Sequence, residues 1–230
     1  MKTSNQLLIG LIVIIFAAIF GTATVLKGEY EKIDKDDPFY GYVTDSLADF
    51  SAIKLKGKYP NLIQIQAGNQ FEIKMRDSKP LRMKWTIRND TLVLTYPESD
   101  FPDWFKVQGT LAGRAGIYII APQLTSVQTK LTTCKLTGWN LANLELIQQG
   151  ENSGMALTES NIGNLSATVT QGGMMRIEQS SKIEQATVEV QDISTFTVRP
   201  SAVDSISIQA DSTAQVQIPG YLLHQSEFRQ

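Results

Sequence analysis

The sequence predicts an all-β protein in which a solenoid of stacked coils follows one N-terminal transmembrane helix. Three observations predict it: an uncharged apolar run near the N-terminus, alternating apolar residues from Phe50 onward, and a repeat of about 20 residues in the C-terminal half. A unit of that length is too small to bury an apolar face alone, so such units stack. A solenoid is a scaffold, and the predicted fold does not by itself indicate a molecular function.

The N-terminal helix is predicted from residues 7–26, a run of 20 residues without one charge. As a helix this run would be about 30 Å long at about 1.5 Å per residue, which is one bilayer crossing. Lys2 precedes the run, whereas residues 27–37 carry three lysines and five acids, so the positive-inside rule favours a domain outside the cytoplasm. We expect residues 1–26 to be a single-pass anchor or uncleaved signal. A cleaved signal ending near Gly21-Thr22-Ala23 is the alternative, and it also exports the chain.

Residues 27–49 are polar and acidic, and we expect them to form a juxtamembrane linker. From Phe50 the apolar residues alternate with polar ones, which predicts short strands separated by turns. The β-helical domain is expected over residues 50–220, and residues 221–230 are expected to be a C-terminal tail or cap. The alternating apolar residues include Ile53, Leu55, Ile63, Ile65, Phe71, Ile73, Met75, Leu81, Met83, Trp85, Ile87, Leu92 and Leu94.

The repeat consists of two ladders of apolar residues, and each repeat unit contributes one residue to each ladder. The first ladder has spacings of 21, 20, 21 and 20 residues, and the second has spacings of 17, 21, 21 and 20. Two strands therefore recur in every coil. The first ladder is Leu136, Leu157, Ile177, Val198 and Ile218, and the second is Val127, Leu144, Leu165, Ala186 and Ile206.

Charge and cysteine content exclude several classes of function. The net charge of −2 gives no reason to expect nucleic acid as a partner. The charges are distributed unevenly, because residues 51–90 have nine bases and three acids, whereas residues 141–230 have four bases and ten acids. Cys134 is the single cysteine, so no intramolecular disulfide or cysteine-based metal site is available. We expect Cys134 to be a core residue.

We expect no catalytic, cofactor-binding or metal-binding residue, and hence no enzyme. The single histidine, His224, lies near the C-terminus, and the G-x-S-x-G sequence of hydrolases is absent. Polysaccharide-active β-helix enzymes need paired carboxylates, or a carboxylate with an arginine or lysine, on one face. Glu178 and Glu184, with Arg176 and Lys182 close in sequence, are the candidates for that alternative.

Two surfaces are candidates for binding. Basic residues alternate with apolar ones on the early strands, which predicts one basic outward face that could meet an anionic glycan or another envelope protein. The loop of residues 96–105 contains two prolines and the aromatic residues Phe101, Trp104 and Phe105, which could contact sugar rings or cover the end of the solenoid. The basic face is predicted to consist of Lys54, Lys56, Lys74, Arg76, Arg82, Lys84 and Arg88.

Several segments together resemble one bacterial family. They are the lead from Phe50 to Phe71, the strand YIIAPQL at residues 118–124, and the coils NLELIQQG at 143–150 and NLSATVTQGG at 164–173. Over residues 50–218 the chain resembles the auto-transporter adhesin head domain family, also called the head GIN domain. The resemblance implies an exported right-handed single-stranded β-helix, found especially in Bacteroidetes, with an undefined biochemical function. The Ser-Gly-x-Gly corners of that family are reduced here to Gly150 with Gly154 and to Gly172-Gly173.

The combined expectation is a non-catalytic, membrane-anchored protein of the bacterial cell envelope. Its exported domain would have a structural or adhesin-like role, without a cofactor, and homo-oligomers are one expected form of assembly. The alternatives are a polysaccharide-active β-helix enzyme and a self-assembling β-helical scaffold.

Overall fold

The computed structural model describes residues 3–34, 37–76, 83–96, 111–223 and 227–229. By its contacts the chain divides into two units, Met1–Tyr42 and Val43–Gln230.

The first unit contains helix α1 (Thr3–Glu31), which extends five residues beyond the expected end at Leu26. Its segment Leu8–Glu31 is long and apolar enough to cross a membrane, and none of the tested window is buried. The Thr22 and Thr24 hydroxyls donate to the backbone carbonyls of Ala18 and Phe20 at 2.9 and 2.8 Å, which satisfies polar groups that lipid would leave without partners. By length and composition, α1 could be a signal anchor or a membrane span.

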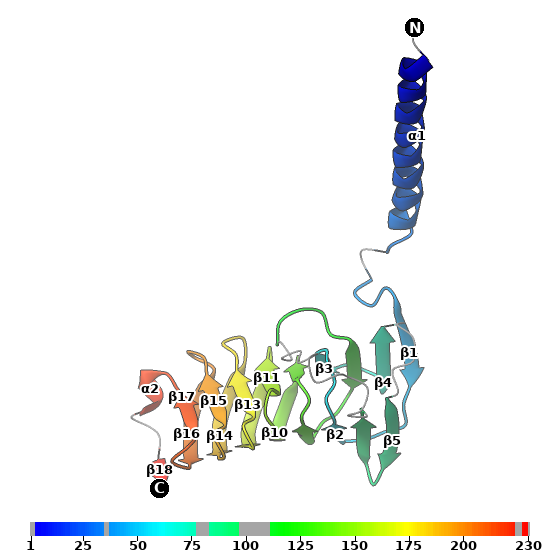
Figure 1. Ribbon diagram of the computed structural model, residues 1–230. Helices are drawn as coiled ribbons and strands as arrows, with labels where there is room; N and C mark the ends of the chain where they lie inside the picture. The colour runs from blue at the N-terminus through cyan, green and yellow to red at the C-terminus, as the bar shows by residue number, and fades with distance from the viewer. Residues whose placement is uncertain (1–2, 35–36, 77–82, 97–110, 224–226, 230) are drawn as a thin grey trace. The chain divides into compact units, whose positions relative to one another are not determined.

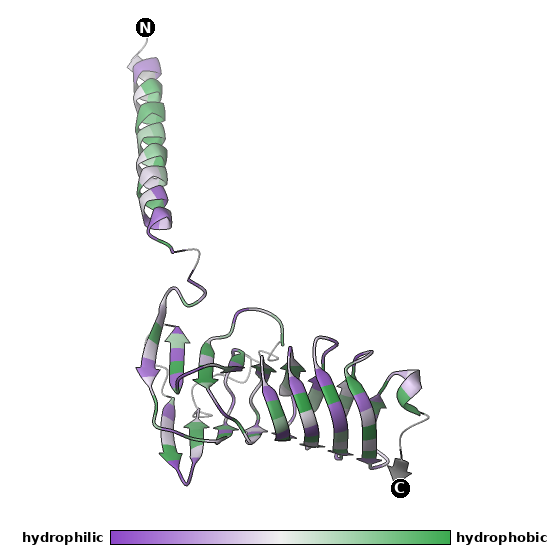
Figure 2. Cartoon of the chain, turned by 180° about the vertical axis from the view of Figure 1, so that it is seen from behind, coloured by the Kyte–Doolittle hydropathy of each residue, from purple (hydrophilic) through white to green (hydrophobic). Residues whose placement is uncertain are grey.

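The second unit consists almost entirely of short strands, with apolar and polar residues alternating along them (Figure 2). The elements are β1 (Tyr42–Ser46), β2 (Ala52–Lys56), β3 (Ile63–Ala67), β4 (Glu72–Arg76), β5 (Lys84–Arg88), β6 (Thr91–Thr95), β7 (Ile117–Ala121), β8 (Ser126–Lys130), β9 (Cys134–Thr137), β10 (Asn140–Gln149), β11 (Gly154–Thr158), β12 (Asn161–Thr170), β13 (Met174–Ile177), β14 (Lys182–Val190), β15 (Thr195–Val198), β16 (Val203–Ala210), β17 (Gln215–Gln217), α2 (Gly220–Leu223) and β18 (Glu227–Arg229).

Within the described residues these strands form two sheets of nine strands each. Sheet A has the order β1-β4-β7-β3-β9-β11-β13-β15-β17, and sheet B has the order β18-β16-β14-β12-β10-β8-β2-β6-β5. From β8 onward successive strands alternate between the two sheets, and Figure 1 shows the later strands side by side in sequence order.

The prediction of a right-handed single-stranded β-helix, a solenoid of about 20-residue coils over residues 50–220, is wrong. The chain forms two large mixed sheets, and both are open rather than closed. Strand β4 pairs antiparallel with β7, and β5 pairs antiparallel with β6. The strand orders β7-β3-β9 and β8-β2-β6 also depart from the sequence order that continuous winding would give. Turn chemistry explains part of this difference, because Asn89 and Asp90 both have positive φ, 48° and 60°, and reverse the chain between β5 and β6.

The predicted ladders nevertheless pair almost as expected in the C-terminal half. Leu157 of β11 lies opposite Leu136 and Ile177, and Ile177 lies opposite Val198. In the second ladder, Leu165 is paired with Leu144 and Ala186, and Ala186 is paired with Ile206. Val127 is an exception, because it lies opposite Leu146 rather than Leu144. The last step of the first ladder is not tested, because the paired residues of β17 end at Gln217, one residue before Ile218.

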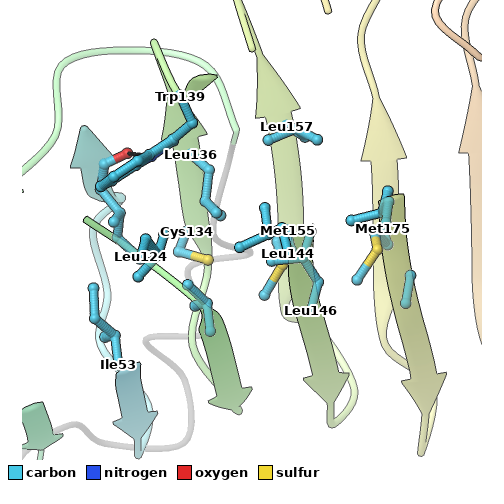
Figure 3. Close-up of a cluster of buried hydrophobic side chains, with 14 of the residues drawn as sticks. Ile53, Leu124, Cys134, Leu136, Trp139, Leu144, Leu146, Met155, Leu157 and Met175 are labelled. Atoms are coloured by element: carbon cyan, nitrogen blue, oxygen red, sulfur yellow. Dashed lines mark hydrogen bonds between the residues drawn. The ribbon is translucent and has the colours of Figure 1, made fainter. Parts of the chain in front are cut away.

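The core lies between the two sheets, where inward residues of both meet. Figure 3 shows side chains from several strands meeting there, among them Leu136, Leu146 and Met155. Trp139 is the largest fully buried residue among those described, and its indole Nε1–H donates to the carbonyl of Ile65 at 3.2 Å. This bond satisfies the polar atom that burying a tryptophan would otherwise leave without a partner.

Stacked turns at the sheet edges are held by glycine and serine. Gly150 and Gly172 have φ values of 103° and 75°, which other residues adopt only with strain, and this confirms the predicted glycine corners at these two positions. At another edge, the backbone N–H of Trp139 donates to Ser160 Oγ at 3.2 Å, and the N–H of Ser160 donates to Ser181 Oγ at 3.4 Å. Each serine thus satisfies a backbone donor of the preceding turn.

Helix α2 packs at the end of the repeating strands. Leu222 is buried, and the Tyr221 hydroxyl donates to the carbonyl of Val203 at 2.8 Å. The outermost strands at this end, β17 and β18, have three residues each. Short edge strands offer little template for pairing with another molecule, so this end disfavours strand-to-strand assembly.

Cys134 gives a direct test of the core. The residue is fully buried, which confirms its predicted place, and burial raises the pKa of its thiol. We expect the native chain to resist modification by a maleimide at neutral pH and to react fully in guanidinium chloride, because reaction requires unfolding. Intact-protein mass spectrometry measures both rates. Rapid labelling of the native chain would contradict this packing.

Asp211 gives a second test, because its carboxylate organises two neighbouring turns. It accepts hydrogen bonds from the backbone N–H groups of Asp192, Thr213 and Ala214 at 2.8, 2.8 and 2.9 Å, and from the Thr213 hydroxyl at 2.8 Å. These bonds, that from Asp192 first, lower the pKa of Asp211. The stabilisation is therefore complete above the unfolded value of about 3.9 and is lost as the pH falls through the lower folded value.

We expect Asp211→Ala to lower the Tm at neutral pH by a few degrees. The difference from the wild-type Tm should shrink as the pH falls through the lowered pKa of Asp211, because the wild-type carboxylate is then protonated as well. Differential scanning fluorimetry across the acid range measures this. Asp204→Ala, an exposed aspartate on β16, is the control and should show no such convergence.

Candidate functional site

The structure divides the predicted basic face between two sheets. Lys54 and Lys56 lie on β2, and Lys84 and Arg88 lie on β5, all in sheet B. Lys74 and Arg76 lie on β4 in sheet A. Alternation along a strand determines which residues point outward, but not which sheet the strand joins. Arg82 lies outside the described residues.

Within sheet B, three lysines align across neighbouring strands. Lys56 lies opposite Lys130 of β8 on one side and Thr95 of β6 on the other, and Thr95 lies opposite Lys84. All four residues are exposed and alternate with inward residues, so they lie on the outer face. Neighbouring strands are about 4.8 Å apart, so Lys56 and Lys130 are adjacent and Lys84 is about 10 Å from Lys56. We call Lys84, Lys56 and Lys130 the basic row.

Lys130 is the member of this row that the sequence reasoning missed. It ends β8, SVQTK, in the same register position that Lys56 occupies in β2, AIKLK. Both strands alternate inward and outward residues and end on an exposed lysine. Comparing these two five-residue segments could have found the pair, but only with knowledge that β8 and β2 are neighbours.

The basic row has no acidic partner in the described part of the chain, where no carboxylate oxygen lies within 4.0 Å of its ammonium groups. Lys74 differs, because its Nζ lies 3.0 Å from Glu72 Oε2. Glu145 lies toward the opposite end of its strand, four residues or about 13 Å from the level of the row, and Asp90 is five residues or about 17 Å from it. Glu151 is closer in register, because it lies two residues beyond Gln149, which is opposite Lys130. The three lysines therefore form a positive group, with Glu151 in the turn that follows β10.

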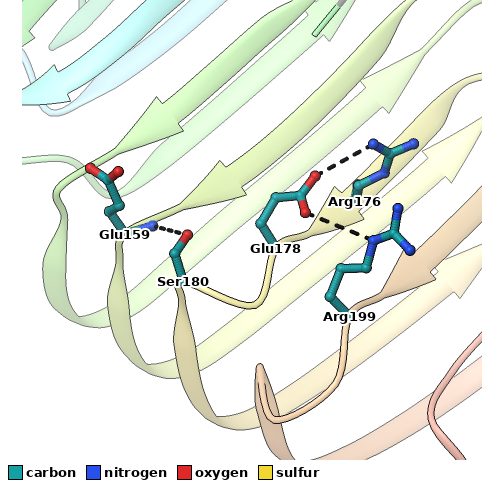
Figure 4. A network of polar contacts seen from close by, with 5 residues as sticks. All are labelled: Glu159, Arg176, Glu178, Ser180 and Arg199. Atoms are coloured by element: carbon teal, nitrogen blue, oxygen red, sulfur yellow. Dashed lines mark hydrogen bonds and ion pairs between the residues drawn. The ribbon is translucent and has the colours of Figure 1, made fainter. Parts of the chain in front are cut away.

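A second charged cluster lies on the side of sheet A. Glu178 contacts two guanidinium groups, with Arg176 Nη1 at 3.4 Å from Oε1 and Arg199 Nε at 3.9 Å from Oε2 (Figure 4). Figure 4 also shows Glu159, whose backbone N–H donates to Ser180 Oγ at 3.0 Å. Each carboxylate thus already has a partner, since Glu159 Oε2 accepts from the Thr137 hydroxyl at 3.2 Å.

The structure does not bring together the acids of the enzyme alternative. Glu178 follows β13 in sheet A, whereas Glu184 lies within β14 in sheet B. Among the residues described, no group of three or more histidine, cysteine, aspartate or glutamate side chains could hold a metal ion. Phe101, Trp104 and Phe105 of the aromatic loop, and His224, lie outside the described residues.

Comparison with known proteins gives a likeness at the level of fold. No protein-family model matches the sequence, and no curated protein matches it. The crystal structure of a protein from Bacteroides fragilis NCTC 9343 called a "putative adhesin" matches with a TM-score of 0.51 and 12% sequence identity. The match covers 81% of this chain and 93% of that one.

Two further crystal structures match less closely. A protein from Parabacteroides distasonis ATCC 8503 called a "putative lipid binding protein" has 13% identity and a TM-score of 0.47, covering 76% of this chain and 80% of that one. A "putative adhesin" from Parabacteroides merdae ATCC 43184 has 10% identity and a TM-score of 0.45, covering 81% and 94%. At such identities the likeness concerns the fold alone, and it rests on the Bacteroides fragilis structure.

Proposed function

We propose that this chain is a non-catalytic binding protein of the bacterial cell envelope. In this proposal α1 anchors it in a membrane as a single pass, and the sheet domain lies outside the cytoplasm, where the basic row binds anionic polymers. The observation that carries the proposal is the row of Lys84, Lys56 and Lys130, exposed in register and without an acidic partner in the described residues.

The physical argument rests on repulsion between like charges. Lys56 and Lys130 are direct neighbours across parallel strands, and like charges in that position destabilise a sheet. An anionic ligand would relieve that repulsion by placing negative groups between the two ammonium ions. Since the chain as a whole has a net charge of −2, the positive group on sheet B is a local feature and not a consequence of a basic protein.

Two further points support an adhesin-like envelope role. The helix α1 has the length and composition of a membrane span. The fold resembles that of a Bacteroides fragilis protein called a "putative adhesin". Both alternatives, a β-helix enzyme and a β-helical scaffold, assumed a fold that the chain does not have.

The binding part of the proposal is tested with the full chain in nanodiscs of uncharged lipid. We expect it to bind immobilised polygalacturonate, an anionic polysaccharide, and not uncharged dextran. Binding should weaken strongly between about 0.1 and 1 M salt, because the Debye length falls from about 10 to about 3 Å. Equal binding to both polymers, or binding that is insensitive to salt, would argue against recognition by the lysines.

The location is tested by cysteine labelling. Cys134 is buried and gives little background, so Ser212→Cys in an exposed turn supplies one reactive thiol. A membrane-impermeant maleimide should label this variant in intact spheroplasts as completely as after lysis. Labelling that appears only after lysis would place the domain in the cytoplasm.

A further inference from the structure

The basic row continues across the sheet as a line of uncharged polar residues. Lys130 lies opposite Gln149 of β10, and Gln149 lies opposite Thr170 of β12. Both side chains are half-buried and alternate with the buried residues Gln148 and Val169, so they lie on the same outer face as the lysines. The extended row is Lys84, Thr95, Lys56, Lys130, Gln149 and Thr170, one residue from each of six neighbouring strands.

The extended row is a line of side chains that can form hydrogen bonds. At about 4.8 Å per strand its six positions span about 24 Å. The charges occupy one end, and the amide of Gln149 and the hydroxyl of Thr170 occupy the other. A ligand that contacts the whole extended row must therefore be long, and it must have both anionic groups and neutral hydrogen-bonding groups.

An exposed lysine gives little binding energy to a small anion. Measured contributions of exposed ion pairs are about 0.2–1 kcal/mol, and all three lysines of the row are exposed to water. Useful affinity on such a surface requires several weak contacts made by one molecule. A polymer of repeating units provides them.

We propose that the extended row binds one chain of a linear acidic polysaccharide that lies across the strands. This inference rests on the proposed function and specifies the ligand and its orientation. A sugar ring in a linear chain is similar in length to the separation of two strands, so successive rings can meet successive side chains. Carboxylates pair with the lysines, and ring hydroxyls form hydrogen bonds with Thr95, Gln149 and Thr170.

A single-stranded nucleic acid is the competing polyanion. Recognition of unpaired bases uses aromatic side chains on which the bases stack. The extended row contains none, and its uncharged end offers an amide and a hydroxyl, which suit the hydroxyl groups of a sugar chain. The geometry therefore favours the polysaccharide.

The test uses the full chain in uncharged nanodiscs and a series of oligogalacturonates from about two to about eight units. We expect the affinity to rise by at least about tenfold until the oligomer spans the row, at about five units, and to rise little beyond that length. The double variant Gln149→Ala, Thr170→Ala should lose several-fold affinity for long oligomers and none for the shortest. Lys56→Gln should weaken binding at every length.

The matched control is Gln128→Ala with Thr168→Ala, the same residue types on a neighbouring line of the same face. It should bind all oligomers as the wild type does. If oligomers of all lengths bind equally, or if the two double variants behave alike, the ligand does not follow the row, although the proposed anion binding survives. No binding at any length overturns both proposals. Tighter binding of a single-stranded oligonucleotide of equal charge would overturn the polysaccharide assignment.

Discussion

Replacing Trp139 by alanine is expected to lower the free energy of unfolding by about 3–5 kcal/mol. The side chain is only 2% exposed, so its removal leaves a large cavity between the two sheets. It also removes the donor that satisfies the carbonyl of Ile65. Urea denaturation of the full chain in detergent, followed by far-ultraviolet circular dichroism, measures the loss.

Two companion variants make this prediction specific. Trp139→Phe retains much of the apolar volume and loses only the hydrogen bond and part of the ring, so it should cost clearly less than alanine. Ile193→Ala changes an aliphatic residue that is 75% exposed, and it should stay within about 0.5 kcal/mol of the wild type. A loss of less than about 1 kcal/mol for Trp139→Ala would mean that the residue does not pack as described.

The second large effect is expected on binding. Neutralising the basic row with Lys56→Gln, Lys84→Gln and Lys130→Gln should weaken binding to polygalacturonate by about tenfold or more at low salt. Three exposed ion pairs of about 0.5 kcal/mol each together account for that factor. Biolayer interferometry with the full chain in uncharged nanodiscs gives the ratio.

A control variant is needed to separate the effect of net charge on binding from the effect of the basic row. The matched control is Arg76→Gln, Arg88→Gln and Lys182→Gln, which removes three exposed positive charges outside the row. It should retain most of the affinity. An equal loss for both triple variants would show that the protein attracts polyanions through its overall charge and not through the aligned lysines.

The C-terminal half shows how far apolar spacing determines pairing. A step of 20 or 21 residues placed Leu136, Leu157 and Ile177 in register, and the structure confirms that alignment. Val127 was assigned opposite Leu144 but pairs with Leu146. Both leucines point inward from one strand, and a pattern with period two cannot distinguish positions two residues apart.

In the N-terminal half the sequence predicted strands but not their partners. The segments around Ile53, Ile63 and Ile73 are strands, as their alternation indicated. Their pairing involves residues far apart in sequence, as in Lys56 with Lys130, and no local pattern reports it. The Asn89-Asp90 turn was a usable signal for a hairpin, and hairpins are antiparallel, so it already conflicted with a uniform β-helix.

Because local patterns do not report pairing between distant strands, the sequence predicted only part of the candidate site. Alternation correctly placed Lys54, Lys56 and Lys84 on outward positions, but it could not separate them from Lys74 and Arg76 on the other sheet. Lys130 was missed because it is the only base in its strand, and no cluster in the sequence pointed to it. The row exists only because β2 and β8 end, and β5 begins, at one level of sheet B.

The most direct test of the central claim is lysine footprinting of the full chain with and without polygalacturonate. Acetylation rates of individual lysines are read by mass spectrometry at low salt. The basic row predicts that Lys56, Lys84 and Lys130 become slower to react when the polymer is present, while Lys135 on sheet A and Lys182 at the start of β14 keep their rates. Protection that is absent, uniform over all lysines, or confined to Lys135 and Lys182 would contradict the account.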